Sequence, residues 1–382
     1  MKRMGPIMLA LGLAFFAQAA QADWTPSKRL TWTMGNSGHP VSLRDYDGRL
    51  HVFWEDYTFG DSEIFHKKSQ DGGTTWSAAQ RLTWTLGHST RPAAALDNFG
   101  PIYLVWQDEV SGNVEIYFSR STDDGVTWSA RKRLTWSSGD SQNVAITVDA
   151  SDYLHVVWED LTPGNAEIFH RMSSDGGVTW APVQRLTWAS GGSVLPAITH
   201  DSYSGVHVVW QDAAPGNDEI YYASSTDGGA TWAAPRRLTW TSKGSNAPSI
   251  DLYFDQIFIA WYDFTFGLSE IAFKKSTDGG STWWLDKVLT WTSNFSYDPA
   301  IIVCSPGVLH VVWEYYTPGY DDLYYKSSSD GGTTWTASRR LTFTPGDSWY
   351  PEIMPDSSGD LHLFWSDDTP GNFEIYYKKF IK

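Results

Sequence analysis

The chain has 382 residues, of which 15% are aromatic, and it contains 22 tryptophans but a single cysteine. Its formal net charge of −16 disfavours nucleic acids and anionic membrane surfaces as partners, because like charges repel one another. The lone cysteine, Cys304, excludes an intramolecular disulfide and lies in an apolar run where a buried thiol is expected.

The N-terminus is typical of a secretory signal peptide. Two basic residues precede an apolar stretch from Met8 to Phe16, and Ala20-Gln-Ala22 forms a cleavage site of small residues. The apolar stretch is too short to span a bilayer. We therefore expect residues 1–22 to be removed, which leaves a mature domain of residues 23–382 with a charge of −18 that is secreted or periplasmic.

The rest of the chain is a sevenfold repeat. The phrase Arg-Leu-Thr-Trp recurs in steps of 51 or 52 residues, with some variation, and ends at Trp32, Trp84, Trp136, Trp188, Trp240, Trp291 and Phe343. A second set of tryptophans ends an apolar run in each copy, at Trp54, Trp106, Trp158, Trp210, Trp261, Trp313 and Trp365. An acidic residue follows nine positions later, at Glu63, Glu115, Glu167, Glu219, Glu270, Asp322 and Glu374. A repeat of this length is typical of propellers and solenoids.

Each unit is predicted to form four short strands. Strand A follows the Pro of runs such as Pro-Ala-Ile, strand B ends in the second tryptophan, strand C begins at the acidic residue, and strand D carries Arg-Leu-Thr. Such strands, rich in Val, Ile, Tyr, Trp and Thr and separated by Gly, Pro and Asn, are typical of an all-β fold. The sequence therefore predicts a seven-bladed β-propeller of four-stranded blades.

The two ends of the repeat region predict how the ring closes. Trp24 stands eight residues before Trp32, so the N-terminal segment is a strand D without a blade of its own, whereas the C-terminus supplies strands A, B and C. We expect the two ends to complete one shared blade, which removes the exposed sheet edges of an open ring.

Between strands C and D lies a Ser-x-Asp-x-Gly-x-Thr-Trp motif. This motif resembles the Asp box, or BNR repeat, of the sialidase-like β-propeller superfamily, and the resemblance covers residues 23–382. Its carboxylate is expected to accept backbone N–H bonds in a tight turn, while the tryptophan covers the hairpin. The boxes are therefore interpreted as structural at Asp71, Asp123, Asp175, Asp227, Asp278 and Asp330.

The resemblance also raises the question of sialidase activity. Sialidases of this superfamily use an arginine triad, a Tyr–Glu nucleophile pair and an Asp, on the face opposite the boxes. The connections that build that face contain Arg91 and almost no other arginine, the Phe-Arg-Ile-Pro motif is missing, and the count is seven blades where the enzymes usually have six. Each departure weakens the enzymatic interpretation.

The carboxylates repeated in every blade are interpreted as structural. One active site needs one pair, whereas every copy carries something like Glu55, Asp56 and Glu63, so bonds to loop backbone, to a neighbouring blade or to the serine after each Arg-Leu-Thr-Trp are expected. No cofactor is expected. A calcium site in the Asp-rich loops stays open, although no known ligand spacing is present.

Most of the tryptophans also belong to the framework. The two sets above and the Asp-box set, including Trp24, account for 20 of the 22, and we expect them to pack between blades. Trp284 and Trp349 lie outside the pattern.

Function is best sought where the copies differ. Two positions vary freely before strand A, from Gly38-His39 and Thr90-Arg91 through to Tyr297-Asp298 and Trp349-Tyr350, and the B–C loops become aromatic on one side of the ring. Aromatic rings beside carboxylates suit sugars, whose C–H faces stack and whose hydroxyls donate hydrogen bonds. The hypothetical ligand site comprises Tyr262, Tyr297, Asp298, Tyr315, Tyr316, Trp349 and Tyr350.

These observations favour a secreted recognition module that binds glycans without catalysis. One alternative is a divergent sialidase-like exo-glycosidase, and another is a structural or protein-interaction scaffold of the cell envelope. The expected partner is a glycan or an extracellular protein, with no membrane insertion, and the oligomeric state stays open.

Overall fold

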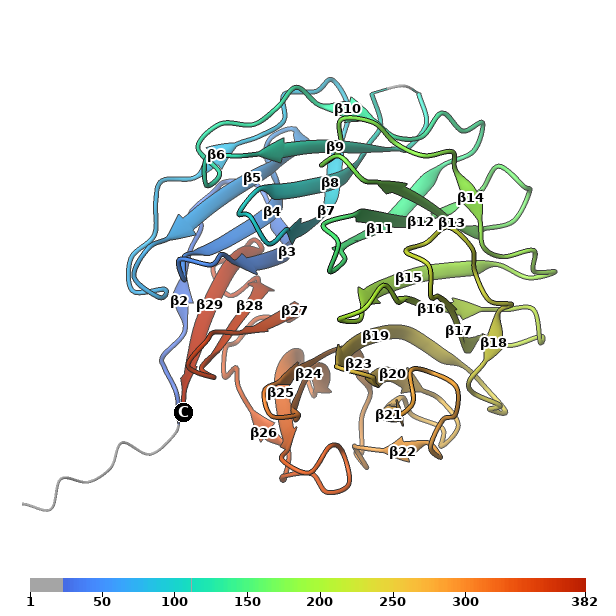
Figure 1. The fold of residues 1–382 in the computed structure, drawn as a ribbon. Coiled ribbons are helices and arrows are strands. Elements are labelled where there is room, and N and C mark those ends of the chain that lie inside the picture. The colour runs from blue at the N-terminus through green and yellow to red at the C-terminus, as the bar shows by residue number, and fades with distance from the viewer. Residues whose placement is uncertain (1–22, 111) are drawn as a thin grey trace, which may run out of the picture.

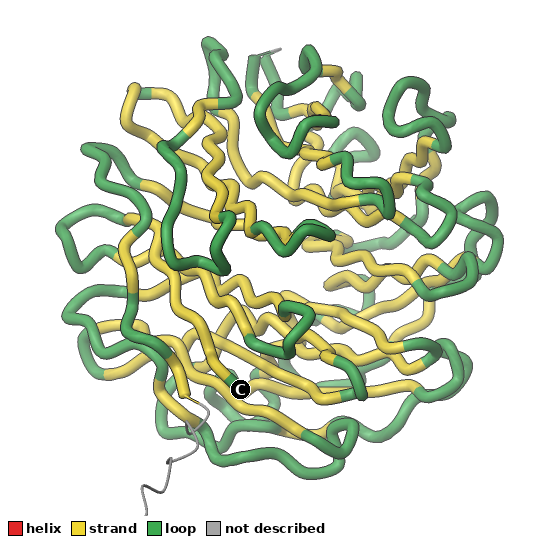
Figure 2. Tube along the Cα trace, turned by 60° about the vertical axis from the view of Figure 1, so that its left-hand side comes forward, coloured by secondary structure: helices red, strands yellow, loops and turns green. Residues whose placement is uncertain are grey.

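The computed structural model describes residues 23–110 and 112–382, and the expected signal peptide lies outside this part of the chain. The regular structure of the described residues is β-strand, arranged as seven sheets around a central axis (Figures 1 and 2). This confirms the predicted seven-bladed propeller. Among the described residues, no helix is long and apolar enough to cross a membrane.

The first six blades each consist of four consecutive strands. Blade one contains β3 (Ser37–Arg44), β4 (Leu50–Phe59), β5 (Asp61–Ser69) and β6 (Gln80–Arg81). Blade two contains β7 (Ser89–Leu96), β8 (Ile102–Asp108), β9 (Glu115–Ser121) and β10 (Lys132–Arg133). Blade three contains β11 (Ser141–Val148), β12 (Leu154–Asp160), β13 (Glu167–Ser173) and β14 (Gln184–Arg185). Within each blade, the first strand lies nearest the axis and the fourth lies outermost (Figure 1).

Blades four to six repeat this order. Blade four contains β15 (Ser193–His200), β16 (Val206–Asp212), β17 (Glu219–Ser225) and β18 (Arg236–Arg237). Blade five contains β19 (Ser245–Tyr253), β20 (Gln256–Asp263), β21 (Glu270–Ser276) and β22 (Lys287–Val288). Blade six contains β23 (Ser296–Cys304), β24 (Val308–Thr317), β25 (Tyr320–Ser328) and β26 (Arg339–Arg340).

Blade seven is shared between the two ends of the chain, as predicted. It contains β27 (Ser348–Pro355), β28 (Leu361–Asp367) and β29 (Glu374–Ile381), and its outer strands are β2 (Lys28–Arg29) and β1 (Asp23–Trp24). Both N-terminal strands pair antiparallel with β29 (Figure 1).

The tryptophans of the second strands form the buried core between blades, but they do not end these strands as predicted, because each strand continues at least to the second residue after its tryptophan. Each of these tryptophans is at most 1% exposed. In six blades the indole N–H donates to the aspartate two residues later, as in Trp210 Nε1 to Asp212 Oδ2 at 3.0 Å. The same aspartates accept the hydroxyl of the serine that begins the first strand, for example Ser37 to Asp56 at 2.8 Å. This partly buried polar network satisfies the indole and joins the first two strands.

The Asp boxes hold their own hairpins. Asp71 accepts the backbone N–H of Thr75 at 2.7 Å and its hydroxyl at 2.6 Å, and these bonds lower the pKa of Asp71 to about 2. Trp76 of the same box packs edge-on against Phe364 and Tyr377 of the preceding blade.

Two other expectations about the repeat unit were wrong in detail. The first strand begins at the serine three residues before the expected proline, so the freely varying positions lie within the strand. The aromatic residues that end Arg-Leu-Thr-Trp do not pack between blades, because they are 68–72% exposed. They follow the outermost strand, where no further strand covers them.

Candidate functional site

The third residue of each first strand has the same unusual backbone conformation in all seven blades. These hub residues have φ between 41° and 56°, a left-handed region that non-glycine residues seldom adopt. Each lies at a β-bulge where the register with the second strand shifts. The hub residues are His39, Arg91, Asn143, Leu195, Ala247, Asp298 and Tyr350.

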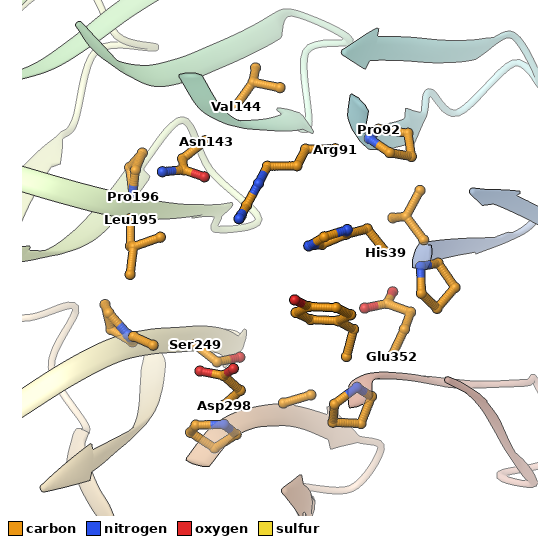
Figure 3. Close-up of a pocket in the computed structure, with 18 residues that line it drawn as sticks. His39, Arg91, Pro92, Asn143, Val144, Leu195, Pro196, Ser249, Asp298 and Glu352 are labelled. Atoms are coloured by element: carbon orange, nitrogen blue, oxygen red, sulfur yellow. The ribbon is translucent and has the colours of Figure 1, made fainter. Parts of the chain in front are cut away.

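The bulges aim the hub residues into one pocket of about 390 Å³ at the mouth of the central channel. The residue after each hub residue, usually proline, completes the wall together with Glu352 and Ser249. Figure 3 shows the side chains of His39, Arg91 and Asp298 converging from different blades. Seven identical backbone positions thus present seven different side chains to one space.

A side chain from the preceding blade holds most of these bulges. Glu55 Oε2 accepts the backbone N–H of Arg91 at 2.8 Å, and Glu159 and Glu314 do the same for Leu195 and Tyr350. In two blades a glutamine has this role, with Gln107 and Gln211 as acceptors for Asn143 and Ala247. Because an uncharged amide accepts the same bond in two blades, the repeated residues have a structural role here, as the sequence indicated.

Two of the seven junctions between blades have a different residue at the position of the accepting Glu or Gln. Tyr262 and Ser366 stand where the other blades have Glu or Gln, and they precede the hub residues Asp298 and His39. The His39 side chain donates from Nδ1 to Glu55 Oε1 at 2.9 Å, and its ring stacks on Tyr350 with the ring centroids 3.9 Å apart. Its Nε2 is buried and has no partner among the described residues. Such an atom favours a ligand in this part of the pocket.

Two acidic residues, Asp298 and Glu352, line the pocket, and Glu55 and Glu314 bond the backbone of hub residues beside it. Burial raises the pKa of Glu314 well above its usual range, and the charge of Asp298 raises it further. Burial also raises the pKa of Asp298, although the charges of Arg91 and His39 oppose this. Burial also raises the pKa of Glu352 to about 7. Burial raises the pKa of Glu55 too, but the bonds from His39 and the Arg91 backbone outweigh it, so the net pKa is lowered.

The structure brings some of the predicted ligand residues together and separates others. Tyr350 and Asp298 line the pocket. Trp349, on the other side of its strand, stacks on Phe373 at 4.6 Å and donates to Asp321 at 2.9 Å.

The four other predicted tyrosines lie near the ends of strands, Tyr262 in β20, Tyr297 in β23, and Tyr315 and Tyr316 in β24. Tyr297 packs edge-on against Tyr262 at 5.5 Å. Tyr315 packs against Tyr324, while Tyr316 beside it is exposed. None of the four is among the residues that line the pocket.

The site hypothesis left out His39, Arg91, Asn143, Leu195 and Glu352. A sequence signal for the first four exists, because they are the second members of the freely varying pairs. Alternation along a regular strand would place the two members of a pair on opposite faces, and only the bulge decides which member faces the axis.

The pocket differs from the arginine triad that the resemblance implies. Arg91 is the one arginine among its lining residues. In six blades an arginine of the outer strand pairs with the repeated acidic residue of the third strand, as in Arg81 to Glu63 at 2.6 Å. These arginines lie at the outer edge of the blades and not at the axis.

A second polar cluster lies beside the Asp box of blade two. Asp45, His51 and Asp124 bring ligand atoms within 4.8 Å of one another, and Asp124 replaces a box glycine with φ of 60°. Lys68 lies 2.7 Å from Asp124, and Arg49 lies 3.2 Å from Asp45. Calcium prefers six or more oxygen ligands, whereas these two carboxylates already have cationic partners. The calcium site stays a prediction.

Several solved structures are similar to this chain in fold. An ulvan lyase of polysaccharide lyase family PL25 superposes with a TM-score of 0.66 at 11% identity, covering 92% of this chain and 95% of that one. A protein of unknown function from Dyadobacter fermentans gives 0.63 at 13%, covering 94% and 98%. The NanB sialidase from Streptococcus pneumoniae gives 0.52 at 14%, covering 92% and 70%. At these identities the likeness extends to the fold alone.

No curated protein matches the sequence. The profile of the BNR repeat-like domain matches residues 88–311, which is more than half of the chain. Together with six Asp boxes in register and seven closed blades, this match shows that the chain belongs to the BNR repeat-like domain family and is a sialidase-like β-propeller.

Proposed function

We propose that the protein recognises a glycan in the central pocket without transforming it. The observation that carries the proposal is the convergence of seven structurally equivalent hub positions with seven different side chains. A structural role would be served by equal residues at equal positions. The differences at the hub instead create one asymmetric site in an otherwise repetitive molecule.

The chemistry of the pocket suits a hydroxyl-rich ligand. Tyr350 offers a ring face, while Asn143, Asp298 and His39 offer donors and acceptors, and Leu195 lines the other side. Sugars combine such C–H faces and hydroxyls. Arg91 is the one arginine among the lining residues, whereas a sialic acid carboxylate is bound by several, so a neutral sugar fits the pocket better than a sialic acid.

A glycan array with purified residues 23–382, with and without calcium, tests the proposal. We expect selective binding that Tyr350→Ala and Arg91→Ala abolish. Arg44→Ala is the matched control, because Arg44 ends the first strand of blade one and bonds to Ser357, away from the pocket. Silence across the array would overturn the proposal and favour a protein-interaction scaffold of the cell envelope.

A second candidate function is glycoside hydrolysis by a divergent sialidase-like exo-glycosidase. The paired pKa elevation of Asp298 and Glu314 favours it, because such enzymes need a carboxyl that is protonated near neutral pH. Release of a chromophore from aryl glycosides, lost in Glu314→Gln, would establish catalysis. Binding without any turnover would leave the recognition module.

A further inference from the structure

The seven exposed aromatic residues after the fourth strands form a second repeated feature of the surface. These rim aromatics are Trp32, Trp84, Trp136, Trp188, Trp240, Trp291 and Phe343. Each begins the connection that leads from the outer strand of one blade to the hub residue of the next. The rim aromatics therefore lie at the same end of the blades as the pocket, but at the circumference of the propeller.

The exposure of the rim aromatics is maintained although neighbouring positions have diverged. Two residues further on, the copies have Met34, Leu86, Ser138, Ser190, Ser242, Ser293 and Pro345. These neighbours range from large apolar to small polar, whereas the rim position is aromatic in seven of seven copies. Burial does not explain this, because no more than a third of each aromatic side chain is covered.

The rim rings are held in place by fixed guanidinium groups. Arg81 lies over the Trp84 ring at 5.7 Å, and its own position is set by Glu63 and by the carbonyl of Thr83 at 2.7 Å. The same arrangement recurs at the rims of blades two, three, four, six and seven. An exposed cation–π contact stabilises by only about 0.5–1 kcal/mol, so its main effect is to orient the ring.

Blade five shows that the orientation is kept by other means when the arginine is absent. Val288 replaces the arginine, and Phe266 from the loop of the same blade packs on Trp291 at 4.8 Å. The exposed ring is thus retained with a different support.

A groove accompanies the rim aromatic of blade one. It has a volume of about 500 Å³ and runs between blades one and two, with Trp84 and Trp128 among its walls beside Arg81 and Arg131. Both arginines are paired with carboxylates, Arg81 with Glu63 and Arg131 with Asp108 at 3.6 Å. The groove is therefore aromatic, rich in hydrogen-bond donors and close to electrically neutral.

We propose that the rim aromatics are seven equivalent sites that bind pyranose rings of a neutral polysaccharide. This inference rests on the proposed function in that both assign a glycan ligand, but it uses a different surface. An indole face stacks on sugar C–H groups, the paired guanidinium donates to hydroxyls, and the net charge of −16 disfavours polyanions. Seven weak sites on one rigid ring bind a polymer far more tightly than a single sugar.

Affinity electrophoresis in gels that contain galactomannan, xyloglucan, mixed-linkage β-glucan or alginate tests the inference. We expect retardation in at least one neutral polymer and none in alginate. Trp84→Ala should weaken binding less than about threefold, whereas Trp84→Ala, Trp188→Ala and Trp240→Ala together should weaken it more than about tenfold. Trp284→Ala is the matched control, since this exposed tryptophan lies outside the rim set, and it should change nothing.

A measurement on the unaltered protein covers the case in which the triple variant does not fold. Acrylamide quenches exposed tryptophans, so saturating polysaccharide should reduce quenching, and free monosaccharide should not. Absence of both retardation and protection would overturn the rim sites. Retardation abolished by Tyr350→Ala but unchanged in the folded triple variant would also overturn them and leave the pocket proposal standing. Retardation by a polysaccharide together with no binding on the glycan array would overturn the pocket proposal and leave the rim sites standing.

Discussion

The hub and the rim of the propeller use repetition in opposite ways. At the hub, seven positions share one backbone conformation, and their side chains all differ. At the rim, six of the seven side chains are tryptophan, and the exposed ring is kept even in blade five, where Phe266 replaces the arginine support. The difference teaches that an internal repeat can either concentrate its variation into one specific site or copy one weak site around a ring.

The sharpest test of this comparison is to replace the buried tryptophan and the rim tryptophan of one blade in two separate variants. Trp210→Ala should destabilise the fold by about 3–5 kcal/mol, because it empties a fully buried position and removes the partner of Asp212. Trp240→Ala at the rim of the same blade should cost less than about 1 kcal/mol. Chemical denaturation monitored by circular dichroism gives both values. Equal losses would mean that the rim aromatics belong to the core.

Two glutamates beside the hub should respond to pH with opposite signs. The pKa of Glu352 is raised to about 7, so its ionisation costs stability as the pH rises from about 4.5 to about 7. Glu352→Gln should therefore be more stable than the unaltered protein at pH 8, by up to about 3 kcal/mol, and equal to it at pH 4.

Glu55 is the matched opposite case. Its lowered pKa means that the carboxylate contributes stability above the ordinary glutamate pKa and loses it as the pH falls through the folded pKa. Glu55→Gln should therefore be less stable at pH 7, with the difference vanishing in acid. Melting temperatures from about pH 2 to about pH 8 measure both variants, and a common sign would refute the assigned environments.

The smallest expected effects concern the hub backbone itself. Leu195 has φ of 52°. Leu195→Val should cost about 1–2 kcal/mol, because a β-branched residue is strained in the left-handed region, whereas Leu195→Asn should cost less than about 0.5 kcal/mol. The same denaturation assay distinguishes them. If Val is tolerated as well as Asn, the hub does not impose its conformation.

The number of blades and the closure of the ring could be predicted because they depend on the spacing of sequence motifs that recur in each of the seven repeats. The sequence did not predict which residues of each first strand line the pocket. Trp349 and Tyr350 are adjacent aromatic residues, and only the bulge after Trp349 sends Tyr350 to the axis and Trp349 onto Phe373. The exposure of the rim was missed because tryptophan in a repeated motif usually indicates packing, and the absence of a fifth strand outside the fourth is a property of the assembled sheet.

The joint in blade seven has a mechanical consequence. Six blades are made from contiguous chain, whereas the seventh is closed by β1 and β2, each two residues long, which lie beside β29 from the opposite terminus. A repeat array with free ends can fray one unit at a time, but each blade here has two neighbours. Tension applied between the N-terminal and C-terminal segments would therefore act first on the pairing of these short strands with β29. The strength of this strand pairing, and not the stability of an average blade, would set the force at which the ring opens.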